Sequence, residues 1–284
     1  MTPNSYVTSV SDFVDRVMRW TKDGKRPVAF RGQKYHAWRS FPKVFREDVG
    51  VYKHEKNIVR DLISVHPQEF SSDSSMFDKL VRMQHFQLPT RLLDVTHNPL
   101  VALYFASEEC EIEGSVADGK VQAFFVPERR RRYFDSDLVS CMSNMANLTS
   151  SEKDSVFDSL NDSISVFNKK KPTLNLLHYI KMEKPHFKGE INPSDLIKPV
   201  YVRPKMSNRR IIAQSGAFII FGAYRYGVKV TDSEMGVKRY LVPHAYKKKI
   251  RNELSMLGIY QSSLFPEIDK ASEYIVSNYS NSTL

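Results

Sequence analysis

The densest group of chemically able side chains lies in "LPTRLLDVTHNPLVALYFASEE", residues 88–109. It combines a carboxylate, a hydroxyl, an imidazole and an amide, carried by Asp94, Thr96, His97 and Asn98. Arg91 comes shortly before the carboxylate, and a helical pattern starts directly after the amide. Such a run either caps a helix or forms one wall of a ligand site.

Asn98 stands directly before Pro99, which predicts a helix with Asn98 as its N-cap and proline at its first position. A helix N-terminus offers free N–H groups and a partial positive charge, so it can also bind an anion. An ion pair between Arg91 and Asp94 would hold the preceding loop. A helix cap alone requires neither a hydroxyl nor an imidazole beside it, which favours a ligand site. An isolated histidine, however, is more often structural than catalytic.

A second candidate is Arg31 in "AFRGQ", at the end of a short apolar strand over residues 26–33. A guanidinium at a sheet edge suits phosphate or carboxylate recognition, because it is always charged and donates two parallel hydrogen bonds. Gly32 would let backbone approach a ligand closely or adopt positive φ, and Gln33 follows it. The alternative is that Arg31 pairs with an internal carboxylate, for which Asp94 is a candidate.

The third candidate is "RRIIAQSGAFIIFG", where Gln214, Ser215 and Gly216 interrupt an apolar stretch. We expect a strand over residues 214–224 with a bulge or a close backbone approach at its start. Gln214 would line a site or make an internal hydrogen bond. Arg209 and Arg210 precede the strand and could contact phosphate.

Stronger signatures are absent from the sequence. It has no GxGxxG, GxxxxGK[ST], HExxH or GxSxG motif and no Cys/His spacing for a metal, so no metal site is predicted. Cys110 lies at a helix end and Cys141 in a polar segment, and neither is a good candidate nucleophile. Two cysteines and the lack of an apolar leader predict a cytoplasmic protein.

The charge balance favours an anionic partner. The chain carries 42 Lys and Arg against 32 Asp and Glu, a net charge of +10. Basic residues cluster at 129–132, 169–171, 209–210 and 247–249. These clusters would bind a nucleotide or nucleic acid, or simply keep a solvated surface soluble. No run of about eighteen apolar residues occurs, so no membrane partner is expected.

The pattern of elements predicts an α+β fold with a mixed, partly antiparallel sheet flanked by helices. Strands are expected at 26–33, 90–96, 119–128, 198–204 and 214–224, and a hairpin-like segment at 226–243. Helices are expected at 9–22, with Ser11 as N-cap, and at 52–65, 76–88, 98–111, 245–258 and 266–280. Residues 129–172 are rich in Arg, Ser, Asn and Asp and predict a polar helical insertion. We expect one domain over 1–284 that contains this insertion.

Taken together, "FRGQ", "QHFQLPTRLLDVTHNPLVALYFA", "RIIAQSGAFIIFG" and "GIYQSSLFPEID" resemble the FRG domain family of bacterial and phage proteins. The resemblance extends from about residue 25 to 275 and is weakest over 129–172. The chain has Val95 where the family usually has an aromatic residue, and Ser215 where it tends to have a second glutamine. Some members are associated with mobile elements and phage defence, but the resemblance does not supply a reaction.

The order of these motifs also resembles that of the ADP-ribosyltransferase superfamily. That resemblance implies NAD as substrate, with Arg31 holding the pyrophosphate or ribose and with Thr96 and Asn98 beside the nicotinamide. Gln214 would stand where the superfamily has a glutamate, late in the sequence, that stabilises the oxocarbenium-like state. Gln214 is neutral and cannot offset developing positive charge as a carboxylate would, so Asp94 would substitute. The candidate catalytic residues are then Arg31, Asp94, Thr96 and Gln214. The candidate ligand-binding residues are Gly32, Gln33, Arg91, His97, Asn98, Arg209 and Arg210.

Three functions stay open at this point. The first is an enzyme of NAD or a related nucleotide, of the ADP-ribosyltransferase or NAD-glycohydrolase type and without a required cofactor. The second is a non-catalytic module that binds or senses nucleic acid, in which the four basic clusters form one continuous face. The third is a module that binds another protein. Motif residues that converge in a concave pocket would favour the enzyme.

Overall fold

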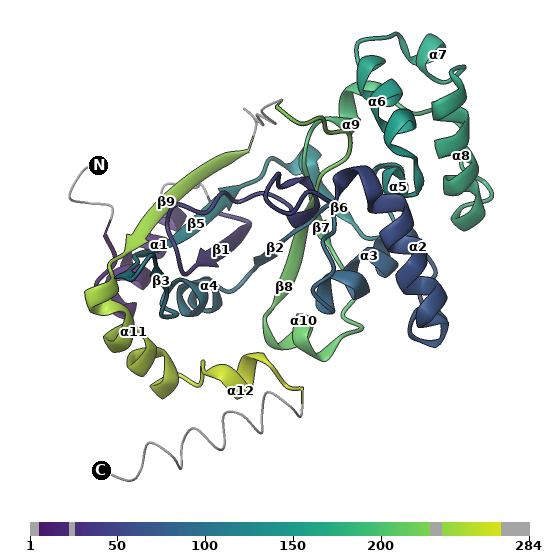
Figure 1. The fold of residues 1–284 in the computed structure, drawn as a ribbon. Helices are drawn as coiled ribbons and strands as arrows, with labels where there is room; N and C mark the ends of the chain where they lie inside the picture. Colours follow the sequence, from purple (N-terminus) through teal and green to yellow (C-terminus); the bar gives the residue numbers. More distant parts are fainter. Residues whose placement is uncertain (1–5, 23–25, 228–234, 268–284) are drawn as a thin grey trace.

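The fold is built on a seven-stranded sheet, seen in a computed structural model that describes residues 6–22, 26–227 and 235–267. Its strands are β1 (Ala29–Gln33), β2 (Leu92–Thr96), β5 (Gly119–Phe125), β6 (Arg131–Tyr133), β7 (Val200–Arg203), β8 (Gly216–Ile220) and β9 (Gly236–Val242). The spatial order is β6-β7-β8-β2-β1-β5-β9 (Figure 1). Only β6 and β7 pair in parallel, so the sheet is mixed and mostly antiparallel.

Helices flank this sheet and confirm the α+β class. They are α1 (Val10–Lys22), α2 (Glu55–Val65), α3 (Met76–His85), α4 (Pro99–Ala106), α5 (Asp137–Asn144), α6 (Ser150–Asp158), α7 (Ile164–Phe167), α8 (Lys171–Glu183), α9 (Pro193–Leu196), α10 (Arg209–Ala213), α11 (His244–Met256) and α12 (Gln261–Leu264). Short 3₁₀ turns lie at Lys43–Phe45, Tyr52–His54, Pro67–Phe70, Glu128–Arg130 and Met145–Asn147. A small hairpin joins β3 (Glu111–Ile112) to β4 (Ser115–Val116).

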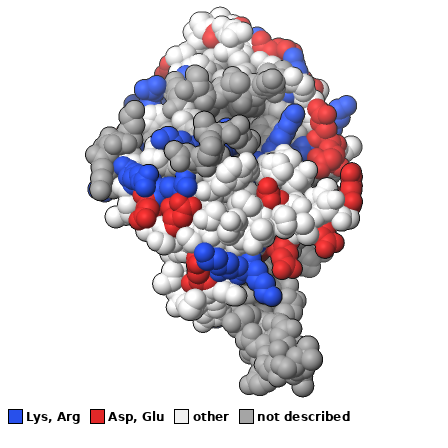
Figure 2. Space-filling model, turned by 90° about the vertical axis from the view of Figure 1, so that its left-hand side faces the viewer, with Lys and Arg blue, Asp and Glu red and all other residues white. Residues whose placement is uncertain are grey.

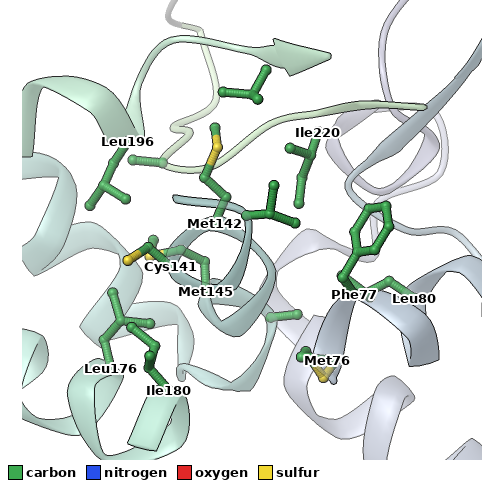
Figure 3. Close-up of a cluster of buried hydrophobic side chains, with 14 of the residues drawn as sticks. Met76, Phe77, Leu80, Cys141, Met142, Met145, Leu176, Ile180, Leu196 and Ile220 are labelled. Atoms are coloured by element: carbon green, nitrogen blue, oxygen red, sulfur yellow. The ribbon is translucent and has the colours of Figure 1, made fainter. Parts of the chain in front are cut away.

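Two separate apolar clusters cover one face of the sheet. Successive strand residues point to alternate faces of a sheet, and two residues paired across strands point to the same face. Phe30 and its partner Thr96 therefore lie on one face, together with Leu92, four positions before Thr96. Toward the β9 edge, Phe30 packs with α1, α4 and α11. Toward the β6 edge, Leu92 packs with α3, α5 and α8. Figure 3 shows other members of this cluster, among them Leu80 and Ile180. In Figure 1 the two helix groups stand apart, one near the β9 edge of the sheet and the other near the β6 edge.

The opposite face carries a third cluster that is rich in aromatic rings. Leu93 and Val95 of β2 point to this side, together with Ile219 of β8. The chain over residues 41–52 and 221–226 covers them with aromatic rings, most of which meet edge-on. Among them are Phe41, Phe45, Tyr52, Phe221 and Tyr224. Loops and short 3₁₀ turns therefore close this face, in contrast to the α-helical cover on the first.

Glycine allows α4 to lie directly on the sheet. A Cβ atom on Gly32 would stand 1.8 Å from the carbonyl oxygen of Ala102, and one on Gly119 would stand 1.9 Å from that of Ala106. No real Cβ atom comes so close to backbone, so both positions must lack a side chain. Gly32 does not have positive φ. Its role is the close approach of a helix to β1.

A buried group of three charges ties distant segments together. Arg91 donates from Nη2 to Glu55 Oε2 over 2.6 Å and from Nε to Oε1 over 3.0 Å. Lys153 donates to the same Oε2 over 2.7 Å. Arg91 also donates to the carbonyl oxygens of Phe221 and Gly222. These contacts join β2 to α2, to α6 and to the chain after β8.

The segment 129–172 is largely helical, and part of it belongs to the core of the protein. It begins with β6, an edge strand of the main sheet. Buried side chains of α5, among them Cys141 and Met142, then pack in the same cluster as Leu80 and Ile220 (Figure 3). Its polar residues lie on both sides of the short helices, since Ser143, Asn144 and Lys153 are buried.

The sequence predicts most element positions correctly, with local exceptions. Residues 209–213 form a helix, α10, where the pattern suggested an approach to a strand, and β8 starts only at Gly216. Ser215 between them has φ 47°, so the break is a left-handed turn after a helix and not a bulge inside a strand. The predicted hairpin-like segment falls partly, and the predicted last helix almost wholly, outside the described residues.

None of the helices formed by the described residues is long and apolar enough to cross a membrane.

Replacing Gly32 with alanine should destabilise the protein by about 3 kcal/mol or more, because α4 must move off the sheet to make room for the methyl group. Urea unfolding of purified protein would measure the loss. Gly236→Ala is the matched control, since no atom of the described residues lies closer than 3.5 Å to a Cβ added to this strand glycine. Equal stability of the two variants would contradict the close-packing account.

Replacing Glu55 with glutamine should cost about 3–5 kcal/mol, because Arg91 and Lys153 would remain buried without their carboxylate. Burial alone would raise the pKa of Glu55, but Arg91 and Lys153 outweigh it and hold the pKa below its usual range. The stabilisation of the fold by ionised Glu55 should therefore be present above the usual pKa range of glutamate. It should disappear as the pH falls through the folded-state pKa of Glu55. Thermal unfolding between pH 3 and 7 would test this, with the exposed pair partner Glu128→Gln as a control that changes little.

Candidate functional site

A pocket lies in the seam between the two helix groups, over β1, β2 and β8. Its volume is about 250 Å³. Helices α3, α4 and α10 contribute its walls, and the three strands form its floor. The lining residues are Phe30, Arg31, Gly32, Val81, Gln84, His85, Asp94, Val95, Thr96, Phe105, Arg210, Ile211, Gln214, Gly216, Ala217 and Phe218. All four candidate catalytic residues are among them.

Arg31 occupies the place where β1 and β2 diverge. The two strands share a single residue pair, Phe30 with Thr96, whereas β1 pairs with β5 along its full length. Beyond that pair, Nη1 of Arg31 donates to the carbonyl oxygen of Asp94 over 2.5 Å. Its side chain thus takes the place of missing strand hydrogen bonds. The carboxylate of Asp94 is not its hydrogen-bond acceptor.

The guanidinium of Arg31 is not fully satisfied by the protein. Among the residues that the structure describes, its Nε is buried and has no hydrogen-bond partner. Burial lowers the pKa of Arg31, the nearby Asp94 partly offsets this, and Arg46 lowers the pKa further. A buried donor without a partner is costly, so such a group commonly meets water or a ligand.

Asp94 is exposed within the pocket and held by a short chain of hydrogen bonds. Gln84 Nε2 donates to Asp94 Oδ2 over 2.8 Å, and Thr90 Oγ1 donates to Gln84 Oε1 over 2.6 Å. The threonine therefore fixes which way the glutamine amide faces, and the amide fixes the carboxylate. An oriented, solvent-accessible carboxylate can act as a general base or stabilise a cation.

Thr96 and Asn98 serve the backbone at the junction. The Thr96 hydroxyl donates to the carbonyl oxygen of Gln214 over 2.6 Å and accepts from the Asn98 N–H over 3.0 Å. The Asn98 side chain accepts from the Leu100 N–H over 2.9 Å, which confirms the predicted N-cap. Thr96 reaches the pocket, but its hydroxyl hydrogen bonds are taken up within the protein. Asn98 does not line the pocket.

Gln214 and Arg210 connect the pocket to the segment after α12. The Gln214 side chain donates to the carbonyl oxygen of Leu264 over 3.1 Å. The guanidinium of Arg210 stacks over the ring of Phe265 at 4.8 Å. Phe265 in turn meets Phe105 of α4 edge-on. A cation therefore lies at the rim beside two aromatic rings, which suits a ligand that has both negative charge and a flat ring.

His85 adds a titratable group to the same rim. Its Nε2 lies 3.7 Å from Oε1 of Glu267, whose Oε2 is buried without a hydrogen-bond partner among the described residues. Burial and the neighbouring Arg210 lower the pKa of His85, against the opposing effect of Glu267. The imidazole is therefore held toward its neutral form, in which it can accept a proton.

Five predicted ligand-binding residues do not line the pocket, and Asn98, described above, is one of them. Arg91 is fully buried and bound to Glu55, so the expected ion pair with Asp94 is not formed. Residues an odd number of positions apart along a strand face opposite sides of the sheet. Arg91 and Asp94 are three positions apart, so their side chains do not meet. The others are Gln33, which accepts from Ser40, His97, which contacts the Tyr201 hydroxyl at 2.6 Å, and the exposed Arg209.

Sequence reasoning missed Gln84, His85 and Phe105. All three lie inside the long central motif, but two of them belong to a helix that reads as amphipathic and one to a helix that is apolar on all sides. The usable signal was the polar pair Gln84 and His85 beside a proline-terminated helix end. Its meaning depended on the hydrogen bond to Asp94, which spans ten residues.

The arrangement can bind a ring-bearing anion and place one carboxylate against it. Arg31 and Arg210 supply positive charge, and Phe105 and Phe218 supply apolar walls. Within the described ranges, no three His, Cys, Asp or Glu side chains are placed to hold a metal ion.

The four basic clusters do not form one continuous face. Residues 247–249 lie on α11 at one end of the molecule, and 169–171 lie at the start of α8 at the other (Figure 1). Two cluster members are core residues, since Arg130 is buried against Lys198 and Pro199, and Lys247 against Lys34 and Glu108. On the face shown in Figure 2, basic and acidic residues are interspersed.

Comparison with known proteins gives one match. A search of curated proteins and a search of solved structures each found none. The family model of the FRG domain matches residues 26–113, which include β1, α3, β2 and α4 and therefore most of the pocket's floor and two of its walls. The chain thus contains an FRG domain, as its sequence motifs indicated.

Proposed function

We propose that the FRG domain binds a nucleotide in this pocket, with NAD as the candidate substrate, and cleaves its N-glycosidic bond. The observation that supports this most is the convergence of Arg31, Asp94 and Gln214 from three separate motifs in one concave site. In a protein whose motifs served the fold alone, these side chains would have no reason to share a cavity.

Charge and shape set the binding mode. Arg210 at the rim contacts the phosphates and Arg31 holds the ribose, while the nicotinamide ring lies against Phe105 and Phe218. A volume of about 250 Å³ is below the range of about 300–1,000 Å³ usual for ligand pockets. The cavity therefore accepts the nucleoside part that reacts, and the rest of a dinucleotide extends past the rim.

The chemistry follows from the placement of Asp94. The bond between the ribose C1′ and the nicotinamide nitrogen breaks, and its electron pair leaves with nicotinamide. Asp94 stabilises the positive charge that develops on the ribose, a task that the neutral amide of Gln214 cannot perform. Water then attacks C1′ and loses its proton to Asp94, or an acceptor nucleophile takes the place of water and becomes ADP-ribosylated.

The likeness to ADP-ribosyltransferases belongs to this proposal. It is supported by the order of a strand arginine, a polar strand-to-helix junction and a late polar residue, now seen around one cavity. A cytoplasmic role in phage defence is the setting in which NAD cleavage would matter. The separated basic clusters give no comparable support to nucleic-acid binding.

Replacing Asp94 with asparagine should reduce nicotinamide release from NAD at least about 100-fold while leaving the fold intact. Asparagine keeps an oxygen that can accept from Gln84, and the Asp94 carbonyl that binds Arg31 is unchanged. Nicotinamide would be followed chromatographically, with thermal unfolding of both proteins as the control. Release that proceeds equally in the variant would remove Asp94 from the mechanism.

Replacing Arg210 with alanine should weaken NAD binding about 10-fold or more, because the variant loses a phosphate-binding cation and its stack on Phe265. Calorimetric titration would measure the affinity. Arg209→Ala is the matched control, since this neighbour on α10 is exposed and outside the pocket. If NAD binds neither variant nor the parent protein, the nucleotide proposal fails.

A further inference from the structure

A larger cavity lies on the opposite face of the sheet. Its volume is about 570 Å³, and it shares no lining residue with the first pocket. Strands β5 and β9 form much of its floor, and the chain over residues 37–41 forms one wall. The aromatic cluster that includes Phe41 and Phe221 closes its far side.

A buried lysine projects from the floor of this cavity. Lys120 of β5 is only 8% exposed, and its Nζ donates to the carbonyl oxygen of Trp38. Burial, followed by the proximity of Arg239 and Arg31, lowers the pKa of Lys120 to about 8. No carboxylate pairs with this lysine among the described residues, which is unusual because a buried cation normally has a counter-ion.

The other polar groups add to the positive character of the site. Arg39 and Arg239 are exposed at the cavity, and none of the described residues that line it is Asp or Glu. Gln122 lines the floor beside Lys120 and accepts from the Ser40 hydroxyl. Three cations without an acid therefore face one hollow, whereas the surface pairs elsewhere join opposite charges.

Aromatic side chains complete the wall. Trp38 is 39% exposed although tryptophan is usually well buried, and it meets Tyr35 edge-on. Phe41 and Phe221 form an apolar surface deeper in the cavity. An exposed indole beside cations that have no carboxylate partner among the described residues is the combination that stacks on a ring and neutralises a phosphate.

We propose that this cavity is a second binding site, which takes a phosphorylated metabolite with a flat ring, that is, a nucleotide. The phosphates lie against Arg39, Arg239 and Lys120, and the base stacks on Trp38 with its edge toward Gln122. The site shares no lining residue with the proposed catalytic pocket, and the two open on opposite faces of the sheet. It needs no NAD chemistry, and its test does not depend on the proposed function.

Tryptophan fluorescence gives a direct measurement. The chain has two tryptophans, of which Trp20 is 5% exposed and packs against Phe125 and Tyr240, away from the cavity. Titration with ATP should quench the Trp38 emission with a saturable curve, and the quench should vanish in Trp38→Phe. Adenosine and inorganic phosphate, titrated separately, should each bind at least 10-fold more weakly than ATP, since each fills half of the site.

Variants assign the quench to this cavity. Arg239→Ala and Lys120→Met should each weaken ATP binding about 10-fold, whereas Lys248→Ala, an exposed charge loss on α11, should not. Arg210→Ala in the first pocket should also leave ATP binding unchanged. Binding that Arg210→Ala abolishes and Arg239→Ala spares would place the nucleotide in the first pocket, and absence of a saturable quench would likewise overturn the proposal.

The pH dependence gives a second readout. The groups that face Lys120 are Arg239 on β9, Arg31 on β1 and the Trp38 carbonyl, and the two arginines stay charged throughout. A phosphate favours the protonated lysine, so ATP affinity should fall as pH rises through about 8. That decline should be absent in Lys120→Met, and a decline that persists in this variant would exclude Lys120 as its origin.

Discussion

The contact between α4 and the sheet is the constraint from which the rest of the candidate site follows. A helix can lie this close to β1 and β5 only because Gly32 and Gly119 have no side chain to place against the carbonyl oxygens of Ala102 and Ala106. Once α4 is seated there, its first turn must start directly after β2, and Asn98 caps it without an intervening loop. The glycine of the FRG motif thus acts on the packing of the protein itself. Its contribution to a ligand site is indirect, through the position of Phe105 at the end of the same helix.

That close packing has a consequence for the sheet. The single pairing of Phe30 with Thr96 leaves β1 and β2 to diverge, and Arg31 fills the opening by donating to a strand carbonyl. The arginine therefore stands between the two faces: it lines the first pocket, and its charge lowers the pKa of Lys120 in the second cavity. A sheet that paired completely along β1 and β2 would have no such opening. It would offer neither a pocket floor with a guanidinium in it nor an electrostatic link between opposite faces.

Much of the fold could be predicted because it depends on neighbours in the sequence. Strand alternation, the Asn98–Pro99 cap and the proline-terminated helix before β2 are local signals, and the structure confirms them. Partners that are distant in sequence could not be found in this way. Arg91 pairs with Glu55 and shares it with Lys153 of α6, and only the folded chain brings these segments together. The same holds for Gln84, whose helix periodicity gave no indication that it would hold Asp94. Residue types identified Arg31, Asp94 and Gln214 as candidates, but their convergence is a property of the topology.

The hydrogen bonds of each motif residue now separate structural roles from ligand-facing ones. The side chains of Thr96 and Asn98 form hydrogen bonds with backbone groups of the junction. Helix capping therefore explains most of the polar residues there. Arg31 and Asp94 differ, because the first keeps a buried Nε without a partner among the described residues and the second is an exposed carboxylate that Gln84 orients into the pocket. Most buried donors in folded proteins have a hydrogen-bond partner, although Tyr226 Oη is a further buried group without one among the described residues. The unsatisfied donor and the oriented acceptor, on adjacent strands of one pocket, are therefore the features that a purely structural account of these motifs leaves unexplained.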